Sequence, residues 1–64
     1  MKYRGFKIEV KKADEGYCMT IYRLSDGWIL ADEWNPSINT KSEAIEECKL
    51  DIDDYYENPE AYED

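Results

Sequence analysis

The sequence contains no histidine, and it has only two cysteines, two prolines and three glycines among 64 residues. The absence of histidine excludes catalytic triads of the serine–histidine type and metal sites that depend on histidine ligands. Two cysteines are too few for a disulfide scaffold, and Cys18 and Cys48 lie too far apart in the sequence to form a CxxC pair. We therefore predict two reduced thiols, no catalytic residues, no metal site and no other cofactor.

Long apolar runs are also missing from the sequence. A membrane-spanning helix needs about 20 consecutive, mostly apolar residues, and no such stretch is present. No signal peptide is recognisable either. These absences lead us to expect a cytoplasmic protein that makes no contact with a membrane.

Positive charge is scarce and unevenly distributed. The chain has 8 Lys and Arg residues against 16 Asp and Glu residues, for a net charge of −8. Residues 1–24 hold six basic and three acidic side chains, whereas residues 42–64 hold one basic and ten acidic side chains. Such an acidic block repels nucleic acid and anionic membranes, and it favours a basic protein as the partner. We expect no direct binding to nucleic acid.

The length indicates one domain that spans residues 1–64. Domains near this size bury only roughly 60% of the surface of the unfolded chain. That leaves room for one core and none for an enclosed active-site cleft of typical size. We therefore expect a protein that is not an enzyme, because carboxylates without a cleft do not act as an acid–base pair.

Alternating apolar residues between turn residues predict three strands, at about residues 4–12, 17–24 and 28–34. A two- or four-residue loop between the first two strands places Val10 opposite Met19. Ile8 then faces Ile21, and the core face is apolar on both strands. A three-residue loop would bury Thr20 instead, so we prefer the first register.

The third predicted strand follows an Asp-Gly turn, which suits a tight hairpin. We expect Trp28 and Leu30 on the core face of the sheet. Ile29 and Ala31 then lie on the open face. Asp32 shares the core-side parity in this arrangement, which is unfavourable for a carboxylate unless it lies at the rim.

One helix is predicted over residues 41–57, followed by an acidic tail at residues 58–64. Thr40 and Glu43 form a capping box, in which the Thr40 hydroxyl accepts a hydrogen bond from an amide of the first turn and Glu43 reaches back. Pro59 ends the helix, because proline disfavours helical geometry in the residue before it. One apolar stripe should face the sheet, made of Ala44, Ile45, Cys48, Ile52, Tyr55 and Tyr56.

These elements predict an α+β fold. It consists of a three-stranded antiparallel β-meander with one C-terminal α-helix packed on one face.

The opposite side of the predicted helix is acidic, with Lys49 as its one cation. Like charges at i,i+4 destabilise a helix by a few tenths of a kcal/mol per pair, and anions near its C-terminus are also unfavourable. Two explanations remain open: the acidity keeps the chain soluble, or the carboxylates meet a cationic surface. Neighbouring side chains on one side of a helix lie about 5–6 Å apart at Cβ. A row of carboxylates at this spacing has a charge density comparable in scale to that of a nucleic-acid backbone, which carries about one charge per 3.4 Å on each strand.

Leu50 lies by helical angle near the centre of this acidic side. It is either an ordinary exposed leucine or an apolar anchor inside a charged ring. The candidate partner-binding residues are Glu43, Glu46, Glu47, Leu50, Asp51, Asp54 and Glu57. Tyr22 and Trp34 are secondary candidates, since both can face outward from the sheet.

Two short segments resemble the HicB-like antitoxin domain: Glu15-Gly16-Tyr17, and residues 39–45 with the sequence NTKSEAI. That family has a strand, a turn ending in Gly-Tyr, two further strands and a helix that opens with Thr-x-x-Glu-Ala. The resemblance spans about residues 6–57 and implies a partial double-stranded-RNA-binding-like β-β-β-α fold. It also implies an antitoxin that neutralises a small, basic, RNA-cleaving toxin.

In size and charge the chain is also similar to the short acidic inhibitors carried by phages and mobile elements, including anti-CRISPR proteins. Several of those inhibitors mimic DNA. This resemblance implies a basic nucleic-acid-binding partner such as a CRISPR effector.

The leading hypothesis is a non-enzymatic acidic protein that blocks the nucleic-acid-binding surface of a basic partner, either a CRISPR effector or a toxin. One alternative is a HicB-like antitoxin. Another is a structural or housekeeping interaction module that docks through the open sheet face. A monomer and a dimer are both compatible with these readings.

Overall fold

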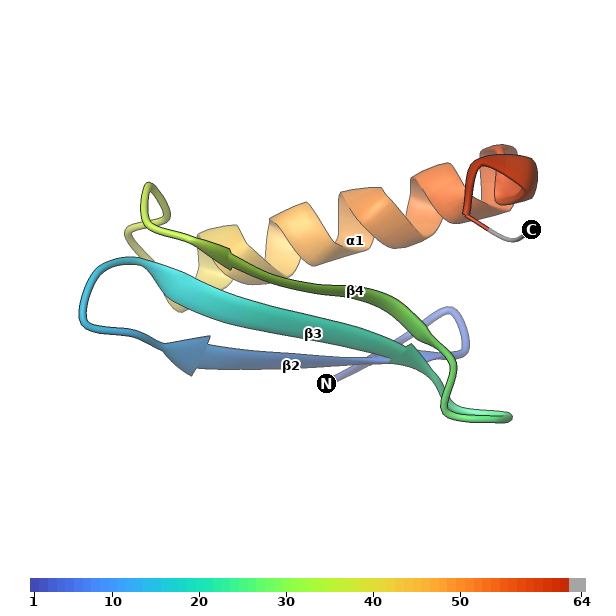
Figure 1. Ribbon diagram of the computed structural model, residues 1–64, viewed down its shortest axis with the longest axis horizontal. Coiled ribbons are helices and arrows are strands. Elements are labelled where there is room, and N and C mark those ends of the chain that lie inside the picture. The colour runs from blue at the N-terminus through green and yellow to red at the C-terminus, as the bar shows by residue number, and fades with distance from the viewer. Residues whose placement is uncertain (63–64) are drawn as a thin grey trace.

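The computed structural model describes residues 1–62 and has an α+β fold in which one helix lies along an antiparallel sheet (Figure 1). The elements in chain order are β1 (Lys2–Tyr3), β2 (Phe6–Lys12), β3 (Tyr17–Arg23), β4 (Ile29–Asn35), α1 (Lys41–Glu57) and the short 3-10 helix η1 (Pro59–Ala61). The strands are hydrogen-bonded in the order β1-β2-β3-β4. In Figure 1 the arrow of β4 points to the end of the sheet where α1 begins, and α1 then runs back along the sheet over β2 and β3.

The prediction of three strands is wrong, because a short fourth strand precedes them. β1 pairs antiparallel with the start of β2 and places Tyr3 opposite Phe6. Arg4 and Gly5 form the connecting turn with φ angles of 49° and 85°, as the type I′ turns of tight hairpins require. Residues 4 and 5, expected within the first strand, therefore belong to a turn. A positive φ at arginine is uncommon, and no local pattern in the sequence indicates it.

The register between β2 and β3 is the predicted one. Val10 lies opposite Met19 and Ile8 opposite Ile21, across a four-residue loop. Gly16 closes this loop with a φ of 75°. A Cβ atom at Gly16 would lie 2.1 Å from the backbone oxygen of residue 35, so the close approach of β4 requires glycine there.

The alternation along β4 differs from the prediction because the strand contains a bulge. Ile21 lies opposite Ala31 and Tyr22 opposite Ile29, which leaves Leu30 as an extra residue. An extra residue shifts the alternation by one. Ala31, expected on the open face, therefore packs against the core together with Leu30. Ile29 is exposed, as predicted.

Because of the bulge, two acidic residues lie on the opposite faces of the sheet from those predicted. Asp32, expected on the core side, lies opposite Thr20 and accepts a hydrogen bond of 3.2 Å from the Thr20 hydroxyl. Glu33 lies opposite Met19, on the side of the sheet that faces α1. Because α1 packs over β2 and β3, Glu33 stays exposed beside the core, and its charge remains hydrated.

The core lies between α1 and the sheet. Its buried residues are Phe6, Ile8, Met19, Ile21, Ile38, Ala44, Cys48, Ile52 and Tyr55. The buried stripe of α1 is narrower than predicted, since Ile45 is half-buried and Tyr56 is 45% exposed. Aromatic contacts reinforce its C-terminal half: the Tyr55 ring lies edge-on to the Phe6 ring at 5.4 Å between centroids.

Both ends of α1 have hydrogen-bonded caps. The Glu43 amide donates to Thr40 Oγ1 at 3.1 Å. The Glu43 carboxylate accepts from the Asn39 amide at 2.9 Å, so the predicted box reaches one residue beyond the cap. At the other end the Asn58 amide donates to the Asp54 carbonyl at 2.8 Å.

The predicted acidic tail begins with ordered structure. Residues 59–61 form η1, and the Tyr62 ring then lies edge-on to the Tyr55 ring at 6.0 Å between centroids. Residues 63–64 of the predicted tail lie outside the described residues.

Candidate partner-binding surface

One flank of α1 faces β4 and carries a row of carboxylates. Glu47, Asp51 and Asp54 share this flank, because residues three and four positions apart lie on the same side of a helix. Glu33 of β4 is close enough to raise the pKa values of both Asp51 and Cys48. We refer to Glu33, Glu47, Asp51 and Asp54 as the acidic surface.

Asp51 lies at the centre of the acidic surface. Its side chain is half-buried, and burial raises its pKa. The charges of Glu33, Glu47 and Asp54 raise the pKa of Asp51 further. None of the ion pairs between residues 1 and 62 includes a member of the acidic surface. The surface therefore concentrates negative charge that this part of the chain leaves without a salt bridge.

The Asp54 carboxylate has one hydrogen-bond partner within the described chain. It accepts a hydrogen bond from the Tyr62 hydroxyl, and this bond raises the pKa of Tyr62 to about 12. The contact joins the end of η1 to α1. It satisfies one of the Asp54 oxygens without neutralising the charge.

Cys48 lies beneath the acidic surface and is buried. Burial raises the pKa of its thiol to about 11, and the charges of Asp51, Glu33 and Glu47 add to the effect. Cys18 is exposed, and both thiols are free. Because the thiolate is the reactive form, the raised pKa and the burial of Cys48 make its thiol a poor nucleophile.

The other predicted partner-binding residues adjoin the acidic surface. Glu46 and Glu57 are exposed, and Leu50 is 61% exposed between them on the outer side of α1. Glu43 is also exposed, but its carboxylate caps the helix. The structure thus brings Glu47, Asp51 and Asp54 together and places the remaining four along the outer side and at the start of α1.

The second flank of α1 faces the β1–β2 hairpin, and its charges are paired. Asp53 Oδ1 accepts hydrogen bonds of 2.8 Å from both Arg4 and the Tyr3 hydroxyl. The Arg4 bond, followed by the Tyr3 bond, lowers the pKa of Asp53. The Arg4 guanidinium also lies 4.3 Å from the centre of the Tyr56 ring, and the Lys49 ammonium lies 5.5 Å from the Tyr3 ring.

The secondary candidates Tyr22 and Trp34 lie on the open face of the sheet, away from α1. Tyr22 is opposite Lys7, and its hydroxyl donates to Glu9 at 3.2 Å. Trp34 is 55% exposed, and its indole nitrogen donates to the Glu15 carbonyl at 2.7 Å. These aromatic residues therefore do not belong to the same surface as the helix carboxylates.

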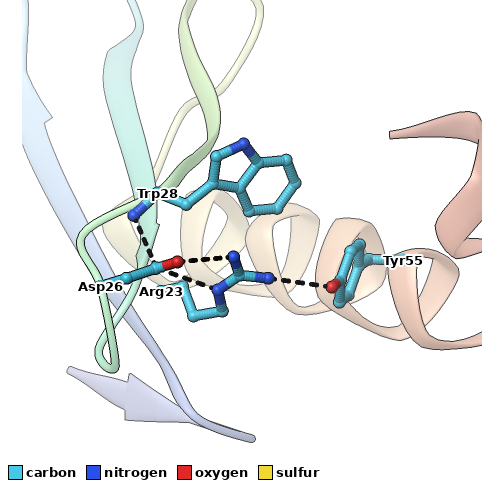
Figure 2. A network of polar contacts seen from close by, with 4 residues as sticks. All are labelled: Arg23, Asp26, Trp28 and Tyr55. Atoms are coloured by element: carbon cyan, nitrogen blue, oxygen red, sulfur yellow. Dashed lines mark hydrogen bonds and ion pairs between the residues drawn. The ribbon is translucent and has the colours of Figure 1, made fainter. Parts of the chain in front are cut away.

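A polar network ties the β3–β4 turn to the C-terminal half of α1 (Figure 2). Asp26 accepts two hydrogen bonds from the Arg23 guanidinium, at 2.7 and 3.0 Å, and one from the Trp28 amide at 3.0 Å. These bonds hold the pKa of Asp26 at about 2. Arg23 also donates to the Tyr55 hydroxyl at 3.2 Å and lies over the Trp28 ring. This cation and anion have a structural role in fixing the turn.

Glu33 is the member of the acidic surface that sequence reasoning missed. The alternation expected for β4 placed it on the open face, and the bulge at Leu30 moves it to the helix side. A signal was present, because the expected alternation put the carboxylate of Asp32 against the core. A one-residue shift removes that conflict and brings Glu33 beside α1.

Residues 1–62 contain neither a pocket nor a cluster of metal-ligating side chains. No group of three His, Cys, Asp or Glu side chains there is arranged to hold a metal ion, and no cleft in this part of the chain could enclose a substrate. Neither α1 nor η1 has the length and apolar character needed to cross a membrane. No family model, curated protein or solved structure matches the chain.

Proposed function

We propose that this chain is a non-enzymatic acidic binding protein that blocks the nucleic-acid-binding surface of a basic partner. The observation that carries the proposal is the acidic surface itself, where four carboxylates converge without a salt bridge among the described residues. A cationic partner would remove their mutual repulsion. Surfaces that bind nucleic acid offer the matching chemistry, because they present arginine and lysine side chains spaced for phosphates.

The outer side of α1 supports contact over a wider area. Glu46 and Glu57 extend the negative charge beyond the acidic surface, and Leu50 is exposed between them. An apolar side chain surrounded by polar groups is common at the centre of protein interfaces. In this proposal the carboxylates supply attraction and orientation, and Leu50 fills a small apolar depression on the partner.

The test uses three charge reversals made together, Glu46→Lys, Glu47→Lys and Asp54→Lys. The immobilised wild-type chain should capture nucleic-acid-binding proteins from the native host extract at low salt, and DNA should compete for them. The triple variant should lose this capture, because attraction between exposed charges depends on charge sign and is screened by salt.

A matched control separates the acidic surface from net charge. Glu9→Lys, Asp14→Lys and Glu15→Lys change the total charge equally at exposed positions of β2 and the β2–β3 loop. This control should retain capture. Equal capture by the wild type and the first triple variant, with both folded by circular dichroism, would exclude the proposed function.

A HicB-like antitoxin is the second candidate, and it uses the same surface against a small RNA-cleaving toxin. The two segments that carry the resemblance adopt the local structures expected of them. Gly16 has a positive φ in the loop before β3, and Thr40 caps α1. A small basic open reading frame beside the gene, and loss of its RNA cleavage on mixing with this chain, would favour the antitoxin over a DNA mimic.

A further inference from the structure

β4 is an edge strand whose outer side has no strand beside it. The sheet order places β4 last, paired with β3 only. Outside that ladder, no backbone hydrogen bond among the described residues involves residues 30–34. α1 packs mainly over β2 and β3. Free backbone N–H and C=O groups on such an edge can pair with an added strand.

Side chains on the two sides of β4 differ in character. On the helix side lie Glu33 and, beyond it, Glu47 and Asp51 of α1. On the open face lie Ile29 and Trp34, which are 52% and 55% exposed. Successive side chains of an added strand point to opposite faces. Such a strand would therefore place one row of side chains near carboxylates and the other row near apolar groups.

A second copy of this chain is a poor occupant of the β4 edge. Two-fold antiparallel pairing about Asp32, the middle residue of β4, would set Asp32 against the same residue of the other copy. Like charges placed opposite each other on neighbouring strands are destabilising. Charge complementarity instead favours a basic strand.

We propose that β4 receives an extended basic segment of the partner protein as a fifth strand of the sheet. Lysine or arginine side chains of that segment face Glu33, Glu47 and Asp51, and the alternate apolar side chains cover Ile29 and Trp34. The cationic nature of the partner rests on the proposed function. The backbone pairing adds a directional contact that charge attraction alone does not supply.

The test uses a blocked nonapeptide of alternating lysine and valine as the probe. It should bind the intact chain. It should also slow amide hydrogen exchange at those residues among 30–34 whose N–H groups point away from β3, because the added strand accepts hydrogen bonds from them. The same peptide with its central amides N-methylated keeps its charge and loses its backbone donors. Its affinity should fall by at least about tenfold, since several backbone hydrogen bonds are lost together.

Two charge-matched variants examine the role of Glu33. Glu33→Lys should weaken peptide binding several-fold, whereas Asp14→Lys, an equal change in the exposed β2–β3 loop, should leave it unchanged. Equal affinities for the two peptides, with no slowing of exchange in β4, would overturn strand addition. That result would leave the proposed function to its own test, in which the wild-type chain and the triple variant at Glu46, Glu47 and Asp54 are compared for capture of nucleic-acid-binding proteins. Dimers of the free chain with protected β4 amides would also overturn the proposal, in favour of a second copy.

Discussion

The two flanks of α1 carry carboxylates of the same kind in opposite surroundings. On the flank toward the β1–β2 hairpin, Asp53 bonds to Arg4 and Tyr3, and its pKa is lowered. On the flank toward β4, Asp51 is half-buried beside Glu33, and its pKa is raised. The pKa values of two aspartates two positions apart on one helix are thus shifted in opposite directions, because the strands beside them differ.

The difference shows that the chain distributes its few cations selectively. Arg4 reaches α1 from a turn with positive φ, and Arg23 is committed to the β3–β4 turn. No comparable cation forms an ion pair with the β4 flank within residues 1–62. The paired flank therefore stabilises the fold, while the unpaired flank lowers its stability.

Truncating a core residue on the buried side of α1, between its two flanks, should produce the largest change in the free energy of unfolding. Ile52 is fully buried, and Ile52→Ala should cost about 2–5 kcal/mol by leaving a cavity. A chain of this length has on the order of 3–10 kcal/mol of stability, so the variant should be close to unfolded. Leu50→Ala, at an exposed position two residues earlier, should change the free energy of unfolding by no more than about 0.5 kcal/mol. Urea denaturation followed by tryptophan fluorescence measures both, and similar losses would mean that Leu50 also contributes to the fold.

The helix and the β2–β3 pair follow from local signals in the sequence. Thr40 and Glu43 define the start of α1, and the register that sets Ile8 opposite Ile21 is the one that makes both buried rows apolar. β1 and the bulge at Leu30 depend on tertiary context. The Arg4-Gly5 turn carries no strong hairpin signal. The one indication of the bulge is that a regular strand would place the Asp32 carboxylate on the core side of the sheet.

The candidate site was predictable to the extent that one helix determines it. Helical spacing groups Glu47, Asp51 and Asp54 without any knowledge of the sheet. Which flank is neutralised depends on how α1 crosses the strands, and therefore on contacts distant in sequence. The pairing of Asp53 with Arg4 depends on the β1 hairpin, which was not predicted.

Removing one tyrosine hydroxyl from each side of α1 should sharpen the comparison between the flanks. The Tyr56 hydroxyl donates to the Arg4 carbonyl at 2.5 Å and holds the hairpin turn against α1. Tyr56→Phe should lower the free energy of unfolding by about 0.5–1.5 kcal/mol, the usual contribution of a hydrogen bond. Tyr62→Phe removes a bond to exposed Asp54, which water can replace, so its loss should be smaller. A larger loss for Tyr62→Phe would show that η1, and not the β1 hairpin, secures this end of α1.

Neutralising Asp53 should reduce the loss of stability in acid. The pKa of Asp53 lies below the ordinary value of 3.8, so its contribution is present above that pH and is lost as the pH falls through the lower, folded-state value. Asp53→Asn should therefore be less stable than wild type at neutral pH, and the difference should shrink on acidification. Asp26 titrates near pH 2 in both proteins and provides an internal reference. A difference that does not vary with pH would mean that the Arg4 pair is not formed in solution.

Neutralising Asp51 should raise the free energy of unfolding at neutral pH, whereas neutralising Asp53 lowers it, and this change should be the smallest of those predicted. Because the folded-state pKa of Asp51 lies above 3.8, wild-type stability falls as the pH rises from about that value through the folded-state pKa. Asp51→Asn lacks this titration, so its advantage over wild type should grow across the same interval and then stay constant. At neutral pH the gain should be about 0.2–0.5 kcal/mol, since the change removes the like-charge pair with Glu47. Urea midpoints taken in steps from pH 3 to pH 7 measure the interval, and added salt should reduce the gain by screening. Destabilisation by Asp51→Asn at neutral pH would mean that an opposite charge does reach this flank in solution, and the contrast between the two flanks would no longer hold.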